Sequence, residues 1–234
     1  MAGRTIFEFA LKAATDLSFV PALLVIASHR RHFELWVGVL QLGSSFLYNT
    51  ADAFDTDLFL ARGQWHFLSD VMSITYVCVL ALHYMQLRDG DANAALRYLA
   101  FTAAWVAKLK DGFGSTVSQA VVIVAFIGGA VLRSAGGGGG GGDGDSAAAK
   151  WKRPAALRGA GLLVLAAAFL AAEVVLNPHM QGPFHVLGQL LGGDASHTLM
   201  LGAAHVLAGG GMYYLWHACP VMDVKQLQSL PVFC

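Results

Sequence analysis

Charged residues are scarce in this chain. Only 13% of its 234 residues are Asp, Glu, Lys or Arg, whereas 56% are hydrophobic, and an ordinary soluble domain carries about 25% charged residues. The sequence is therefore not that of an ordinary soluble domain. Basic and acidic residues number 15 each, so the charge balance does not indicate a nucleic-acid partner. Cysteine is also scarce, and three widely separated cysteines suggest neither a disulfide framework nor a cysteine-based zinc cluster.

Long apolar stretches take up most of the chain instead. Hydrocarbon offers no hydrogen-bond partner to the backbone, so a run of about 20 apolar residues predicts a transmembrane helix. We therefore predict an all-α integral membrane protein, a bundle of seven transmembrane helices that forms a single domain over residues 1–234. The predicted spans are 9–28, 33–50, 65–87, 92–109, 113–132, 157–176 and 196–217.

One connection between the predicted spans is long. Residues 134–153 hold an unbroken glycine run over 136–142 and then charged residues, a composition that predicts a disordered loop. With the N-terminus outside, the cytosolic segments, including this loop, carry ten of the fifteen Lys and Arg residues. The positive-inside rule therefore predicts an N-out, C-in bundle in the plasma membrane or a membrane of the secretory pathway.

Polar residues inside membrane spans are costly and are candidates for function. In the predicted orientation, Ser45 and Asn49 of the second span, His66 and Asp70 of the third, and His205 of the seventh all fall toward the outer side. Ser45 and Asn49 are four residues apart and share a helical face, as do His66 and Asp70. This pattern predicts either a site for a metal ion or lipid head group, or a hydrogen-bonded cluster that only holds the bundle together.

Four other charged residues and one cysteine complete the candidates. Lys12 and Asp16 lie four apart in the first span and are expected to pair with each other. Arg97 and Lys108 lie near the ends of the fourth span, from where long side chains can reach the interface. Cys219 lies just inside the cytosolic boundary, which makes it a candidate for S-palmitoylation, with an unmodified thiol as the alternative.

Several short stretches carry a resemblance to a known family. Residues 29–34 (His-Arg-Arg-His-Phe-Glu), 45–52 (Ser-Phe-Leu-Tyr-Asn-Thr-Ala-Asp) and 68–70 (Leu-Ser-Asp) resemble the transmembrane protein 8 and myomaker family. Residues 204–213 resemble the last helix of the alkaline ceramidases. Both groups belong to the CREST superfamily of seven-helix membrane proteins, which also includes the PAQR receptors. Its pattern is Ser-x-x-x-His in the second helix, Asp in the third and His-x-x-x-His in the seventh.

In that superfamily the three histidines hold a zinc ion, and many members hydrolyse lipid amides or esters. The resemblance assigns catalytic roles to Ser45 and Asp70 and a metal-binding role to His205. Asn49 and Leu201 stand where the other two histidines would be. A catalytic zinc ion normally needs three protein ligands, so the resemblance implies a degenerate site, with Asn49 left to contact a substrate.

The sequence therefore predicts a myomaker-like membrane protein that acts on membrane lipids or membrane organisation and holds no metal. The alternative is a zinc-dependent lipid amide or ester hydrolase, ceramidase-like or phospholipase-like, whose metal site is rebuilt with His66, one turn from Asp70. Whether the protein is an enzyme stays open between these two. A third interpretation, a seven-helix receptor, is supported only by the helix count. The predicted partners are membrane lipids, and the sequence names no protein partner.

Overall fold

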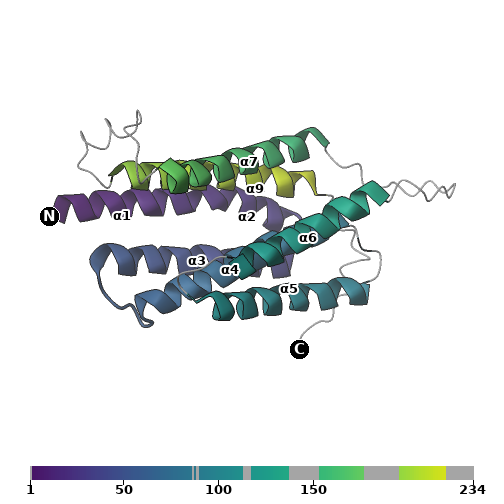
Figure 1. Cartoon of the computed structure of the whole chain (residues 1–234), viewed down its shortest axis with the longest axis horizontal. Coiled ribbons are helices and arrows are strands. Elements are labelled where there is room, and N and C mark those ends of the chain that lie inside the picture. Colours follow the sequence, from purple (N-terminus) through teal and green to yellow (C-terminus); the bar gives the residue numbers. More distant parts are fainter. Residues whose placement is uncertain are drawn as a thin grey trace. The chain divides into compact units, whose positions relative to one another are not determined.

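The computed structural model describes residues 2–85, 87, 90–112, 117–136, 153–176 and 195–219. Within these ranges every regular element is a helix and there is no β-strand, which confirms the all-α prediction (Figure 1). Two helices are long and apolar enough to cross a membrane, over Phe9–Ser28 and Arg62–Met85. A shorter apolar helix covers Val117–Arg133.

The observed helices coincide with the predicted spans but differ from them at the ends. The first predicted span consists of three consecutive elements, and most others begin or end a few residues outside the prediction. The described helices are α1 (Ala2–Asp16), η1 (Leu17–Phe19), α2 (Val20–Ser28), α3 (His32–Phe54), α4 (Arg62–Met85), α5 (Gly90–Asp111), α6 (Val117–Gly136), α7 (Arg153–Leu176) and α9 (Ala195–Ala218).

The predicted loop over 134–153 is shorter than expected. Helix α6 continues to Gly136 and α7 begins at Arg153, so both ends of that segment are helical. A glycine run disfavours a helix interior, and α6 ends where the run begins. The rest of the predicted loop, 137–152, lies outside the described residues.

The chain divides into two compact units, and the single membrane domain over residues 1–234 stays a prediction. The first unit contains Met1–Val25, Ser45–Arg62 and Lys152–Ala218, and the second contains Ile26–Ser44, Gly63–Trp151 and Cys219–Cys234. Helix α3 contributes to both units, with its second half in the first unit.

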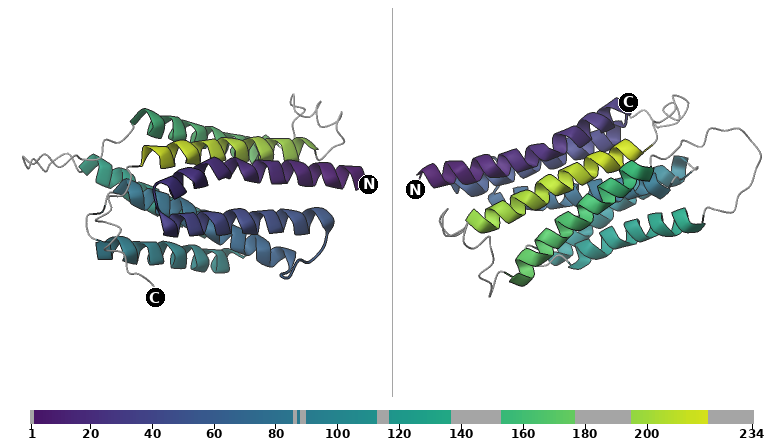
Figure 2. Two further views of the ribbon diagram at one scale, coloured as in Figure 1. Left: turned by 180° about the vertical axis from the view of Figure 1, so that it is seen from behind. Right: turned by 90° about the horizontal axis from the view of Figure 1, so that it is seen from above.

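Glycines set the helix packing of the first unit. Helices α7 and α9 run side by side (Figures 1 and 2). A Cβ on Gly159 would lie 2.8 Å from the carbonyl oxygen of Gly211, and a Cβ on Gly211 would lie 3.0 Å from that of Gly159. A Cβ on Gly209 would lie 2.6 Å from the carbonyl oxygen of Ser18. Helix α9 therefore contacts both neighbours backbone to backbone, the packing that small residues permit in membranes.

A proline explains the 3₁₀ segment η1. Pro21 has no N–H and cannot donate to the carbonyl of Leu17, four residues earlier. The N–H of Val20 donates to that carbonyl instead, which tightens the turn to 3₁₀ geometry. In this turn the Ser18 hydroxyl donates a 3.1 Å hydrogen bond to the backbone oxygen of His205 on α9.

Helix α4 supplies most of the core of the second unit. Its side chains Val71, Met72, Ile74 and Cys78 are buried together with two alanines of α5, Ala100 and Ala104. Aromatic rings extend this core, because the Phe67 and Trp105 rings meet edge to face with centroids 5.3 Å apart. Small side chains on α5 let the larger side chains of α4 pack against it.

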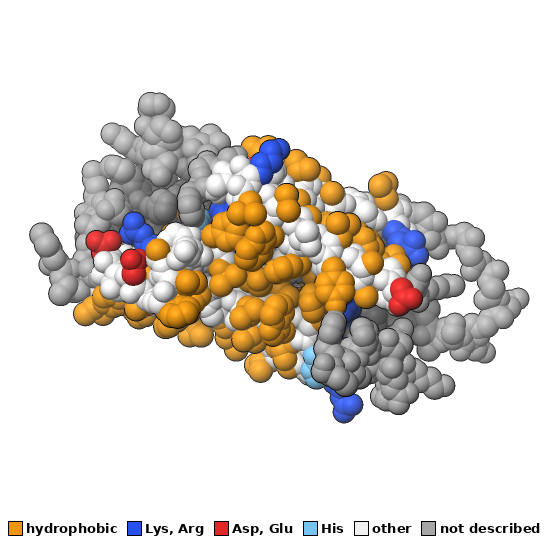
Figure 3. All heavy atoms as spheres, turned by 90° about the horizontal axis from the view of Figure 1, so that it is seen from below, with side chains coloured by type: hydrophobic (Ala, Val, Ile, Leu, Met, Phe, Trp, Pro, Cys, Tyr) orange, Lys and Arg blue, Asp and Glu red, His pale blue; other side chains and the backbone are white. Residues whose placement is uncertain are grey.

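The exposed helix faces of both units are apolar. Figure 3 shows one face on which hydrophobic side chains make up most of the described surface. Examples with their exposed fractions are Leu24 (65%), Leu157 (73%) and Val164 (70%) in the first unit, and Val106 (56%), Val124 (67%) and Leu132 (75%) in the second.

Candidate functional site

Several ionisable side chains lie inside the helical units. Glu34 and Lys108 are each 1% exposed, Asp16 is 4% exposed and Arg97 is 8% exposed. Such groups are almost never fully buried without partners. The described residues arrange them in three clusters, each of which lies within one unit.

The first cluster centres on Asp16, at the end of α1. The Ser45 hydroxyl donates a 2.9 Å hydrogen bond to one carboxylate oxygen of Asp16, and Asn49 Nδ2 donates a 2.6 Å hydrogen bond to the other. Ser45 and Asn49 are four residues apart on α3, so the predicted shared face is the one that contacts Asp16. His205 on α9 lies close enough to interact with this carboxylate electrostatically.

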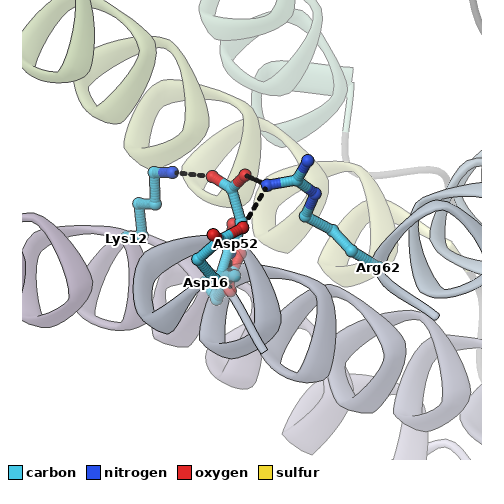
Figure 4. A network of polar contacts seen from close by, with 6 residues as sticks. Lys12, Asp16, Asp52 and Arg62 are labelled. Carbon is cyan, nitrogen blue, oxygen red and sulfur yellow. Dashed lines mark hydrogen bonds and ion pairs between the residues drawn. The ribbon is translucent and has the colours of Figure 1, made fainter. Parts of the chain in front are cut away.

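Lys12 does not make the ion pair expected with Asp16. Its ammonium contacts Asp52 Oδ2 at 2.7 Å, and Arg62 contacts the other Asp52 oxygen at 3.5 Å and Asp55 at 3.4 Å (Figure 4). Within one helix, a basic residue four positions before an acidic one is the weaker orientation of the pair, so a carboxylate on a neighbouring helix can compete with Asp16 for Lys12. On α1, Lys12 lies one turn before Asp16, and on α3, Asp52 lies about one turn after Asn49. The ion pair of Lys12 and Asp52 is therefore adjacent to the hydrogen bonds of Asp16.

The second cluster contains Asp70 and belongs to the second unit. Lys108 of α5 donates a short hydrogen bond to Asp70 Oδ2, and His66 Nδ1 lies 3.6 Å from the same oxygen. The expectation that Lys108 reaches the membrane interface is therefore wrong, because its side chain turns inward to the carboxylate. The expected face shared by His66 and Asp70 is present. Asp70 belongs to another unit than Ser45 and His205, so its predicted meeting with them stays a prediction.

The third cluster joins three helices of the second unit around Glu34. One oxygen of Glu34 contacts His83 Nε2 at 2.6 Å and Arg97 Nη2 at 2.9 Å. Arg97 also donates from Nε to Asn93 at 3.1 Å and lies over the Phe33 ring. Arg97 therefore packs inward as well, contrary to the expected reach toward the interface.

No cluster has the composition of a zinc site. Among the residues that the structure describes, no group of three or more His, Cys, Asp or Glu side chains is placed to hold a metal ion. The side-chain amide of Asn49 donates a hydrogen bond to Asp16. The side chain of Leu201 lies outside the described residues.

Reasoning from the sequence missed Asp16 as a partner of α3, Lys108 as a partner of Asp70, and the whole cluster around Glu34. The sequence contains a signal for Lys108, because Ala100, Ala104 and Lys108 follow one another at four-residue intervals. Small residues at this spacing indicate a packed helix face. The signal for Asp16 is weaker, since nothing local shows which helix lies opposite it.

Cys219 follows α9, and its thiol is buried, at 3% exposed. Burial raises the pKa of this thiol to about 12. The thiolate is the nucleophilic form of cysteine, so a thiol in this state reacts slowly. Acylation of Cys219 stays a prediction, and it requires the thiol to become accessible first.

Within the described residues the chain is all-helical, and two of its helices are long and apolar enough to cross a membrane. It belongs to a family described as a protein of unknown function (DUF3522), whose model matches residues 4–176. The match includes Asp16, Ser45, Asn49 and Asp70, and it ends with α7, before His205. No curated protein matches the chain.

Proposed function

We propose that this chain is a multi-pass protein of the plasma membrane or a secretory-pathway membrane, with seven spans in an N-out, C-in orientation. The observation that supports this proposal is the reversed distribution of polarity. Lys108 is 1% exposed, whereas Leu132 and Leu157 are more than 70% exposed. Lipid tails cover apolar side chains without cost, and charges inside such a bundle persist when they are paired.

Within that membrane protein, we propose a myomaker-like role in the handling or organisation of lipids, with a degenerate CREST-type metal site. Asn49 and Leu201 supply no imidazole where the superfamily pattern has histidines, and Asp70 contacts a lysine ammonium instead of a cation from solution. An internal ammonium compensates the carboxylate charge that would otherwise favour a metal ion. The hydrolase alternative needs His66, Asp70 and His205 to meet around one zinc ion.

Metal content tests this proposal. Detergent-purified protein is expected to contain well under one zinc per chain by elemental analysis, and to hydrolyse lipid amides and esters weakly or not at all. The double variant Asn49→His, Leu201→His restores the superfamily spacing and is expected to gain one zinc per chain, because three imidazoles and an open position make a tetrahedral site. Each single variant is expected to gain much less. One zinc per wild-type chain, lost in Asp70→Asn or His66→Ala, would establish the hydrolase alternative instead.

A further inference from the structure

The Asp16 carboxylate accepts hydrogen bonds from neutral donors, and the side chains of Lys12 and His205 act on it electrostatically. Around it, two cations, Lys12 and Arg62, contact two carboxylates, Asp52 and Asp55. Asp16 contacts neutral donors instead, the Ser45 hydroxyl and the Asn49 amide. Lys12 and Arg62 are thus in contact with Asp52 and Asp55, and Asp16 is the most deeply buried of the three carboxylates.

The hydrogen-bonding capacity of this cluster shows what chemistry it can accept. An ionised carboxylate has about four lone-pair sites, and Ser45 and Asn49 use two of them. Because a carboxylate only accepts, the NH₂ group of Asn49 must face it, and the amide oxygen remains an acceptor. The Ser45 hydroxyl uses its one O–H donor in the hydrogen bond to Asp16, and its oxygen likewise keeps acceptor lone pairs. The cluster therefore presents oxygen acceptors and a negative charge.

A protonated primary amine matches these properties, because it has one positive charge and three N–H donors. A phosphate or carboxylate ligand would be repelled. A divalent metal would require more carboxylate or imidazole ligands than the described residues bring together. Ser45, Asn49 and His205 are partly exposed, whereas Asp16 is buried.

We propose that Asp16, Ser45 and Asn49 form a binding site for the primary ammonium head group of a membrane lipid, of the phosphatidylethanolamine type. The inference rests on the proposed function, because a lipid ligand requires the cluster to lie within a membrane. Charge-assisted hydrogen bonds to the Asp16 carboxylate would supply the affinity, and the acceptors of Ser45 and Asn49 would distinguish N–H donors from methyl groups.

Native mass spectrometry of the detergent-purified full chain tests this site. The probes are phosphatidylethanolamine, its N-methyl and N,N-dimethyl derivatives and phosphatidylcholine, all with the same acyl chains. The wild type is expected to bind the primary ammonium about tenfold more tightly than the quaternary one, with the methylated lipids in between, which corresponds to about 1.4 kcal/mol. Equal binding of all four lipids by the wild type would overturn the proposal.

Two variants assign the preference to the site. Asp16→Asn is expected to abolish it, whereas Asp91→Asn, which removes an exposed carboxylate of the second unit, is the control and is expected to keep it. If Asp16→Asn does not fold, Asn49→Leu is used, which keeps the carboxylate and is expected to lower the preference several-fold. If a folded Asp16→Asn or Asn49→Leu protein still prefers the primary ammonium lipid as strongly as the wild type, the amine binds elsewhere and the proposal is wrong.

Free ethanolamine distinguishes the source of the amine. Competition by ethanolamine at millimolar concentration would show that the site recognises the ammonium group itself, which supports the site but not a lipid ligand. Binding of phosphatidylethanolamine that ethanolamine does not displace supports the lipid. Zinc content measured on the same samples separates the two proposals, because a metal-free wild type without amine preference contradicts only this inference.

Discussion

Asn49 on α3 donates a 2.6 Å hydrogen bond to the carboxylate of Asp16 on α1. If the chain has the degenerate CREST-type site proposed above, Asn49 stands at the position of a metal-binding histidine. A neutral amide at this place can hold a carboxylate through an N–H donor, whereas an imidazole that binds zinc presents a lone pair. The substitution therefore fits a site built around an anionic side chain better than one built around a metal cation.

We predict that the ion pair between the buried Lys108 ammonium and the partly exposed Asp70 carboxylate stabilises the second unit. Lys108→Ala leaves the Asp70 carboxylate without its ammonium partner and is expected to lower the free energy of unfolding by about 3 kcal/mol. Thermal unfolding in detergent measures this change. Lys110→Ala, at an exposed position two residues away, is the control and is expected to have no effect.

The double variant Lys108→Met, Asp70→Asn removes both charges and is expected to recover most of the lost stability, because a neutral pair needs no compensation. A single variant Lys108→Ala as stable as the wild type would show that the pair contributes nothing to the fold.

We also predict opposite effects for two glycines on α7. A Cβ on Gly159 would lie 2.7 Å from Leu215 and 2.8 Å from the backbone of Gly211, so Gly159→Ala must push α7 and α9 apart and is expected to cost about 1–3 kcal/mol. Nothing lies within 4 Å of a Cβ on Gly161. Gly161→Ala is therefore expected to keep or raise stability, by up to about 1 kcal/mol from helix propensity. Equal effects of the two substitutions would contradict the backbone contact between the helices.

The thiol of Cys219 gives a prediction about pH. Its pKa is raised by burial to about 12, so the protonated form is favoured by folding. The stability from this thiol is fully present below the pKa of an unfolded cysteine, about 8.5, and is lost as the pH rises toward 12. Alkylation of Cys219 by iodoacetamide is expected to stay slow from pH 7 to 9 in the folded protein and to become fast on unfolding.

The variant Cys219→Ser is the control for two assays, alkylation and acyl exchange. The part of each signal that disappears in this variant comes from Cys219. Rapid alkylation of Cys219 in the folded protein at pH 7 would show that the thiol is accessible. An acyl-exchange signal that Cys219→Ser removes would establish the predicted palmitoylation.

The orientation can be tested with epitope tags. Tags inserted in the glycine run 136–142 and after Cys234 are expected to bind antibody only in permeabilised cells, because the positive-inside rule places both in the cytosol. A tag before Met1 is the control and should be labelled without permeabilisation when the protein is at the surface. Labelling of the glycine-run tag on intact cells would reverse the proposed orientation.

The sequence predicted the helical class and the approximate position of each helix, because apolar runs of this length have few alternatives. It also placed Ser45 with Asn49 and His66 with Asp70, since each pair lies within one helix and helical spacing determines its face. The partners across helices were predicted incorrectly. Lys12 pairs with Asp52 and Asp16 with α3, because the choice depends on which helices are adjacent, and spacing along one helix carries no such information.

The prediction that Arg97 and Lys108 extend to the interface failed for a related reason. Both positions are close enough to the ends of α5 for that route, but Glu34 and Asp70 lie on neighbouring helices within reach. A nearby carboxylate offers a cation a stronger interaction than the interface does. Recognition of the alanine stripe on α5 would have indicated that Lys108 faces the protein interior.

Pro21 has a consequence for Asp16 that extends beyond its own turn. A 3₁₀ helix advances about 120° per residue and an α-helix about 100°, so the three residues of η1 add a rotation of roughly 60° between the two sides of the segment. The direction in which Asp16 points, relative to the residues after Val20, is thus set by a proline five positions away. Replacing that proline would reorient the carboxylate without touching any residue that contacts it, so the geometry of the cluster is encoded partly in a backbone angle outside the cluster.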